Sequence, residues 1–120
     1  MHYEIRYKPS FAAAFVTLNP GERLTAEAGA MASMDGRLMM TTEFSGGFFA
    51  GLMRRLFGGE SLFVNVFQNR SRSPAELVLT QGSIGDIEVL QLKPGEALCF
   101  QPGAYIAHAG SVNMTVHWAG

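Results

Sequence analysis

This sequence of 120 residues is poor in cysteine and has no excess of charge of either sign. Its single cysteine, Cys99, excludes an intramolecular disulfide and the usual cysteine-based zinc sites. Nine basic residues stand against ten acidic ones, giving a net charge of −1, whereas electrostatic nucleic-acid binders usually carry a basic excess. The composition therefore argues against both classes.

Long hydrophobic runs are also missing. No stretch approaches the roughly 20 apolar residues of a membrane-spanning helix. The first seven residues carry charges where a signal peptide needs an apolar run. Because the chain is 48% hydrophobic, it has enough apolar residues for a core. We therefore expect one soluble, cytoplasmic domain.

Sequence patterns typical of catalysis are absent. The three histidines, His2, His108 and His117, have no neighbouring histidine at metal-ligand spacing. Cys99 stands between Leu98 and Phe100, and we expect a buried, inert thiol there. No Gly-x-Ser-x-Gly, phosphate-loop or dinucleotide-binding pattern is present. We expect no enzyme activity, no metal and no cofactor.

What the sequence does contain is an internal repeat. Leu18-Asn-Pro-Gly-Glu-Arg-Leu24 returns as Leu92-Lys-Pro-Gly-Glu-Ala-Leu98, at an offset of 74 residues without a gap. Pro and Gly restrict the turn, and each flanking Leu is expected to anchor a strand, so one backbone is specified twice. The two turns share a glutamate, Glu22 and Glu96, which could hold a cation or a partner's arginine. We expect instead that it is exposed or accepts hydrogen bonds from nearby backbone N–H groups.

Short alternating stretches with Gly and Pro between them predict many strands. In the first half the expected strands cover residues 3–7, 11–18, 24–28, 30–34 and 38–42, the last two joined as a hairpin by Asp35-Gly36. In the second half they cover residues 76–80, 87–92, a short stretch up to Phe100, and 112–118. The residues expected in the core are Phe15, Val16, Leu24, Ile87, Val89, Leu98, Val116 and Trp118.

These strands predict an all-β fold: a double-stranded β-helix or flattened barrel made of two similar units with one short helical insertion. The chain is expected to form a single domain. Repeat units cover residues 1–46 and 75–120, and an insertion covers residues 47–74.

The insertion contains the one predicted helix, residues 48–57. It also contains an expected strand, residues 62–67, and a polar loop, residues 69–74. One half of the wheel of the predicted helix is apolar: Phe48, Phe49, Leu52, Met53, Leu56 and Phe57. This face has three open interpretations: it covers the protein's own sheet, contacts another subunit as a possible interface, or lies on a membrane surface.

A local basic excess accompanies the insertion. Four arginines, Arg54, Arg55, Arg70 and Arg72, could contact an anion or a nucleic acid. Arginine pairs of this kind are more often solvated charge, so we expect nucleic acid and membrane to be less favoured partners than a second copy of the chain.

Two longer stretches resemble a known family. A Pro-Gly-Glu turn followed by Ala-Glu-x-Gly-Ala-Met lies within Pro20–Met31, and a Gly-bounded segment ending in Leu-Phe-Gly-Gly-Glu-Ser-Leu-Phe lies within Gly46–Phe63. Together with the second Pro-Gly-Glu unit, they resemble the altered-inheritance-of-mitochondria family, whose bacterial members are proteins of unknown function. Members are about twice this long, with further repeats after the position of Gly120, so the chain is expected to be a fragment or a short relative.

The resemblance implies a fold similar to the tryptophan RNA-binding attenuation protein, with a tendency to form ring-like assemblies. It implies no known activity. The function expected from these observations is that of a non-catalytic, self-assembling scaffold or interaction module. The alternative is a protein that binds RNA or a small ligand in the manner of the attenuation protein.

Overall fold

A computed structural model describes residues 1–44, 63–99 and 102–110, and almost all the regular structure in these ranges is β. The strands are β1 (His2–Arg6), β2 (Ala13–Leu18), β3 (Arg23–Glu27), β4 (Met31–Met34), β5 (Leu38–Phe44), β6 (Phe63–Asn69), β7 (Ala75–Thr80) and β8 (Ala107–His108), with one 3-10 turn at Pro102–Ala104. The predicted all-β class is confirmed. In the described ranges no helix is long and apolar enough to cross a membrane.

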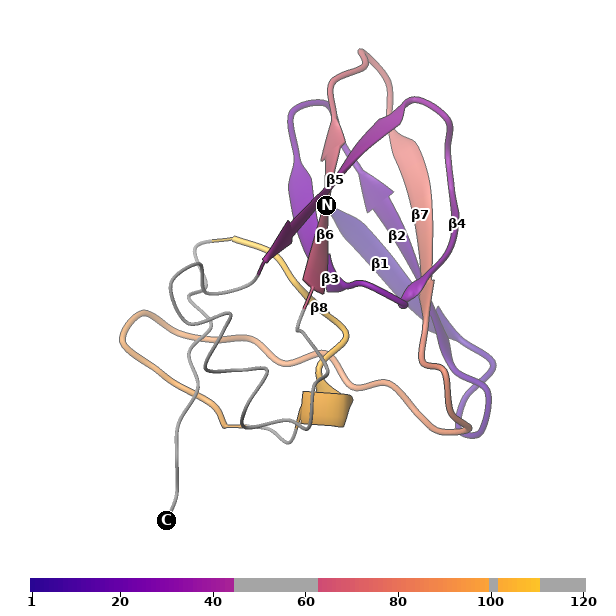
Figure 1. Cartoon of the computed structure of the whole chain (residues 1–120), viewed down its shortest axis with the longest axis vertical. Coiled ribbons are helices and arrows are strands. Elements are labelled where there is room, and N and C mark those ends of the chain that lie inside the picture. The colour runs from indigo at the N-terminus through magenta and orange to yellow at the C-terminus, as the bar shows by residue number, and fades with distance from the viewer. Residues whose placement is uncertain (45–62, 100–101, 111–120) are drawn as a thin grey trace.

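The strands form two antiparallel sheets (Figure 1). The first sheet has the order β1-β2-β7-β4, and the second has the order β5-β6-β3-β8. Neither sheet closes on itself among the described residues, so the flattened shape is that of an open sandwich. The strand predicted before the 69–74 loop becomes β6, which lies in the interior of the second sheet between β5 and β3.

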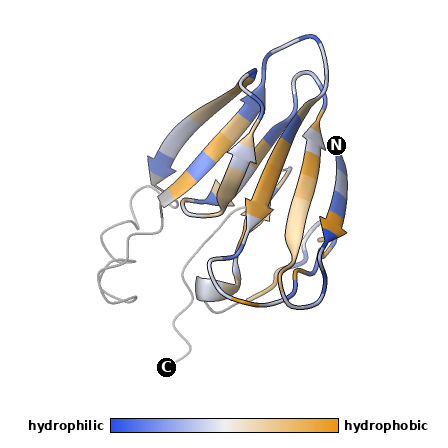
Figure 2. Cartoon of the chain, turned by 90° about the vertical axis from the view of Figure 1, so that its right-hand side faces the viewer, coloured by the Kyte–Doolittle hydropathy of each residue, from blue (hydrophilic) through white to orange (hydrophobic). Residues whose placement is uncertain are grey.

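Alternation along the strands places the core between the two layers, which Figure 2 shows side by side. In β2, Val16 and Leu18 point inward from the first sheet, and Leu77 and Leu79 do the same from β7. From the second sheet they meet Phe67, which is completely buried. These side chains make one continuous apolar cluster, as expected for a chain of this size.

Among the described residues, four short loops carry the chain from one sheet to the other: residues 19–22, 28–30, 35–37 and 70–74. The hairpin predicted around Asp35-Gly36 is therefore wrong. Both strands exist, but β4 pairs with β7 in the first sheet, whereas β5 pairs with β6 in the second. The backbone N–H of Asp35 donates to the carbonyl of Glu76 at 2.9 Å, which directs the turn toward β7 rather than into a hairpin.

One buried amide, that of Asn69, ties two of these loops together. Its Nδ2 donates to the carbonyls of Leu18 and Ser73, both at 2.8 Å. Its Oδ1 accepts from the backbone N–H of Ser71 at 3.0 Å and from the Ser71 hydroxyl at 2.6 Å. Since every hydrogen-bonding position of the amide is used, a polar residue is tolerated with no exposed surface.

The two Pro-Gly-Glu segments adopt the same turn, as predicted. Gly21 has a φ of 85° and Gly95 a φ of 81°, a conformation that glycine reaches without strain. In each turn the glutamate N–H donates to the carbonyl three residues earlier, at 3.0 Å for Glu22 and 2.9 Å for Glu96. This is a type II arrangement with proline at the second position.

The repeat also appears in the strand register. Val16 of β2 lies between Tyr3 of β1 and Leu77 of β7. Tyr3 and Leu77 are separated by the repeat offset of 74, and the other paired residues of the two strands keep this relation. The two edges of β2 are thus occupied, in one register, by two strands that are equivalent in the repeat.

The second unit does not form the strands predicted for residues 87–92 and for the stretch up to Phe100. Residues 87–92 and 97–99 carry no strand, and residues 88–99 are all exposed. The burial predicted for Val89, Leu98 and Cys99 is therefore wrong, since the first two are 45% and 46% exposed and the thiol is also exposed. The reason is topological: β2 and β4 already occupy both edges of β7, to which residues 87–92 would pair as a hairpin.

Of the remaining core predictions, some are confirmed and others fall outside the described residues. Val16, Leu24 and Ile87 are buried as expected, and Phe15 is partly buried. Val116 and Trp118 lie outside the described residues, as does the predicted helix 48–57 with its apolar face. The division into units 1–46 and 75–120 stays a prediction.

Candidate functional site

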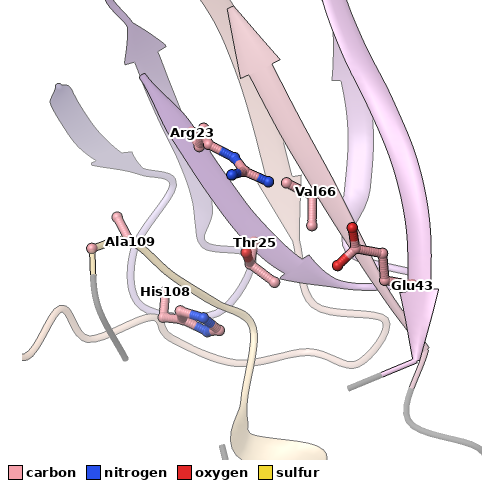
Figure 3. A pocket seen from close by; sticks show the side chains of 7 residues that line it. Arg23, Thr25, Glu43, Val66, His108 and Ala109 are labelled. Carbon is pink, nitrogen blue, oxygen red and sulfur yellow. The ribbon is translucent and has the colours of Figure 1, made fainter. Parts of the chain in front are cut away.

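A polar hollow of about 270 Å³ lies on the second sheet, on the face turned away from the core. Figure 3 shows the side chains around it. They come from all four strands of that sheet and the residues after β8: Arg23, Thr25, Glu43, Val66, His108, Ala109 and Gly110.

Strand alternation explains why these residues share a face. In β3, Leu24 and Ala26 are buried in the core, so Arg23 and Thr25 point to the opposite side. Thr25 pairs with Val66 on one neighbouring strand and with His108 on the other, which places the three side chains in a row across the sheet.

His108 is held by a hydroxyl. The Tyr105 Oη lies 2.8 Å from the His108 Nδ1 and 3.3 Å from the Thr25 carbonyl oxygen. A hydroxyl has one hydrogen, so both contacts are hydrogen bonds when Tyr105 donates to the carbonyl and the His108 Nδ1–H donates to Tyr105. The other ring nitrogen of a neutral His108, Nε2, is then an acceptor.

Burial sets the protonation of this pair. Desolvation lowers the pKa of His108, so the ring is neutral at physiological pH. Burial, with a smaller contribution from the charge of Glu27, raises the pKa of Tyr105 and keeps its hydroxyl protonated. The half-buried end of the hollow is therefore uncharged and can both accept and donate hydrogen bonds.

Two charged side chains, Arg23 and Glu43, lie at the edges of the hollow. Arg23 comes from β3, and Glu43 comes from β5, two strands away. Among the described residues neither forms an ion pair, and both are exposed. The hollow thus presents a cation, an anion and a neutral imidazole around the apolar Val66, an arrangement suited to a small ligand that carries both charges.

No sequence pattern singles out Arg23, Thr25, Glu43 or Val66. Their outward positions follow from alternation, but their grouping depends on the order β5-β6-β3-β8, which the sequence does not state. His108, which has no second histidine at metal-ligand spacing in the sequence, lies in the hollow. Within the described ranges, no group of three histidine, cysteine or acidic side chains comes together, and absence of a metal stays a prediction.

The predicted contact residues are only partly placed. Arg70 and Arg72 are exposed on the loop that Asn69 organises, and the Arg70 Nε donates to the Gln68 side chain at 3.3 Å. Arg54 and Arg55 lie outside the described residues, as do the proposed interface residues Phe48, Phe49, Leu52, Met53, Leu56 and Phe57.

The two repeated glutamates have the local role expected of them. Glu22 Oε1 accepts from the backbone N–H of Asn19 at 2.6 Å, and Glu96 Oε1 accepts from that of Lys93 at 3.3 Å. Each carboxylate therefore closes its own turn, which explains why both turns keep a glutamate without invoking a ligand.

Beyond the hollow, the second unit exposes an unusual amount of apolar surface. We call residues 88–99 the arm; in Figure 1 it is the orange loop that lies below the sheets. Val89, Leu90, Leu92 and Leu98 are 37–54% exposed along it, and its Pro-Gly-Glu turn connects two stretches that have no strand partner among the described residues. Such a segment is a candidate protein-binding surface.

The sequence model of the family described as "Mitochondrial biogenesis AIM24" matches residues 3–120. This confirms the family resemblance drawn from Pro20–Met31 and Gly46–Phe63. A search among curated proteins found no match.

Proposed function

The chain belongs to the AIM24 mitochondrial biogenesis family, and we propose that it serves as a non-catalytic, self-assembling interaction module. The proposal rests on the arm more than on any other feature. An isolated stretch with the residue pattern of a sheet but no strand partner gains stability when another chain supplies that partner.

The exposure of the arm supports this proposal. Its sequence equivalents in the first unit are β2 and β3, where Leu18 and Leu24 are buried. In the arm the equivalent Leu92 and Leu98 are 37% and 46% exposed. Burial of several such side chains in an interface would contribute favourably, since apolar area removed from water is worth roughly 25 cal/mol per Å².

Light scattering coupled to size-exclusion chromatography tests the proposal. The measured mass is expected to exceed that of one chain and to fall toward it on dilution. A mass equal to one chain at every concentration would contradict self-assembly.

The hollow favours a second function, the binding of a small dipolar molecule. Arg23 would bind the anionic group and Glu43 the cationic one, while Thr25 and His108 supply neutral hydrogen-bonding groups. Thermal-shift measurements with free amino acids as probes should show stabilisation, with inorganic phosphate as a single-charge control. Arg23→Gln should abolish the shift, and Arg70→Gln should preserve it. No shift with any amino acid would rule out this role.

RNA binding remains the alternative proposal for the arginine-bearing segments. A gel shift with single-stranded RNA tests it, and binding through phosphate contacts should weaken steeply as salt is raised. Replacement of Arg70 and Arg72 by Gln should weaken such binding. RNA binding that changes neither with salt nor with these substitutions would contradict an arginine-mediated contact.

A further inference from the structure

We infer that residues 87–92, which include the first part of the arm, add as a strand to the open edge of β1 in a second copy of this chain. The inference rests on the proposed self-assembly and specifies its interface. Its evidence is the repeat itself, because the first unit contains the same element already paired.

The element in question is the repeat equivalent of β2. The offset of 74 maps Ala13–Leu18 onto Ile87–Leu92. β2 pairs with β1 on one edge and with β7 on the other, and β1 and β7 are themselves repeat equivalents in the same register. A β2-type segment therefore binds β1-type strands, and this preference is visible twice in one sheet.

Within residues 1–44, 63–99 and 102–110, one β1-type strand has an open edge. β7 is flanked by β2 and β4, so both of its edges are used. β1 pairs with β2 alone in the part of the chain that the structure describes, and it is the edge of the first sheet. An open edge presents backbone N–H and C=O groups to any strand that can match it.

The repeat also gives the register of the new pair. In the sheet Val16 lies opposite Leu77. Adding 74 to Val16 gives Leu90, and subtracting 74 from Leu77 gives Tyr3, so Leu90 is expected opposite Tyr3 in an antiparallel ladder. Both side chains are about half exposed in the single chain, at 54% and 48%. Cross-strand pairs of an aromatic and an aliphatic residue are favourable in sheets.

The chain's own arm is held away from its own β1. Gly85, just before the arm, is fixed by two backbone hydrogen bonds. The Gly85 N–H donates to the Ser10 carbonyl, and the Gly85 carbonyl accepts from the Ala12 N–H. Ile87 then enters the core and is 7% exposed. After the arm, the Gly103 carbonyl accepts a hydrogen bond from the Gln81 side chain, and β8 joins β3 in the second sheet.

Pairing within one chain would therefore remove Ile87 from the core and turn the arm back toward the first sheet. A second copy avoids this cost because its β1 edge can approach an arm that stays in place. Each chain has one arm and one open β1 edge, so two chains can exchange them reciprocally in a two-fold dimer.

Disulfide trapping between two single-cysteine variants tests the inference. Both variants carry Cys99→Ser; one adds Tyr3→Cys and the other Leu90→Cys, with a small tag on one to distinguish the chains. Opposite residues in an antiparallel pair have Cβ atoms about 4.5–5.5 Å apart, close enough for a disulfide after small adjustment. Mild oxidation of the mixture should give a covalent dimer that contains one chain of each kind.

Ile84→Cys, also with Cys99→Ser, is the matched control, because Ile84 is 73% exposed on the same connection but lies outside the arm. Its mixture with the Tyr3→Cys variant should give little mixed dimer. Equal cross-linking of both mixtures, or none in either, would overturn the inference. So would a Tyr3→Cys/Leu90→Cys double variant that closes only within one chain.

Leu90→Asp gives an independent measurement. The variant should keep its fold by circular dichroism, while its dimer dissociation constant rises roughly tenfold or more, a typical effect of losing a central apolar contact. Ile84→Asp should leave that constant unchanged. If Leu90→Asp still forms oligomers and the Tyr3→Cys and Leu90→Cys variants do not cross-link, this interface is refuted but self-assembly is not. A wild-type chain that is monomeric would refute both.

Discussion

The two Pro-Gly-Glu turns share one local geometry but have different surroundings. In both, proline precedes a glycine of positive φ, and the glutamate side chain accepts from a backbone N–H at the start of the turn. The first turn joins β2 to β3 across the sandwich. The second lies within the exposed arm, where the flanking stretches form no strand.

This difference separates local from non-local determinants of structure. A turn of four residues is fixed by backbone preferences and one side-chain hydrogen bond, so it forms in either setting. A strand needs neighbours on its edges. β2 has β1 and β7, and β3 has β6 and β8, whereas the arm has none among the described residues.

The largest expected difference is in the cost of truncating the second leucine of each turn. Leu24 is 6% exposed in the core, and Leu24→Ala should lower the free energy of unfolding by about 2–5 kcal/mol. Leu98 is 46% exposed, and Leu98→Ala should change it by less than about 0.5 kcal/mol in the monomer. Chemical denaturation measures both. Equal losses would show that the two turns have equivalent surroundings.

The next difference concerns the anchor of the first turn. Asn69 binds the carbonyl of Leu18, and Asn69→Ala would leave that carbonyl and the Ser71 groups without their buried partner. We expect a loss of about 2–4 kcal/mol. Asn65→Ala, on the same strand, is the matched control; it loses an exposed bond from the Thr42 hydroxyl and should cost about 1 kcal/mol or less. A smaller loss for Asn69→Ala than for the control would refute the anchoring role.

The smallest expected difference depends on pH. Hydrogen bonds from the Arg37 side chain and backbone lower the pKa of Asp35 from 3.8 to about 2, whereas its repeat equivalent is Ala109. Because the folded pKa is depressed, the stabilisation is complete above the ordinary value of 3.8 and is lost as the pH falls toward 2. Thermal unfolding of wild type and Asp35→Asn should differ slightly at neutral pH and converge in that acidic range. A difference that stays constant down to pH 2 would contradict this.

Much of the fold could be predicted from the sequence because it is encoded in local patterns. Alternating or apolar stretches between turn signals predicted β1 to β7, and the Pro-Gly-Glu signature identified both turns. The hairpin at Asp35-Gly36 was wrong because a turn signal does not say which sheet the following strand joins. The prediction of a strand at residues 87–92 was wrong because the residue pattern carries no information about whether a neighbouring strand has a free edge for pairing.

The hollow could not be predicted from the sequence either, because local patterns do not specify which strands pair. Arg23, Glu43 and His108 come from three strands whose order depends on pairings between distant residues. Asn69 left a weak signal, a polar residue at an inward position of a hydrophobic strand. Such a residue requires buried partners, but the pattern does not identify them.

Amide hydrogen exchange at two protein concentrations tests most directly whether the second repeat needs another chain to form its strand. At a dilution where light scattering gives the mass of one chain, the amides of Ala13–Leu18 should be protected and those of residues 88–92 should exchange rapidly. At a concentration where the chain assembles, residues 88–92 should also become protected. Protection of residues 88–92 in the dilute monomer would contradict the account.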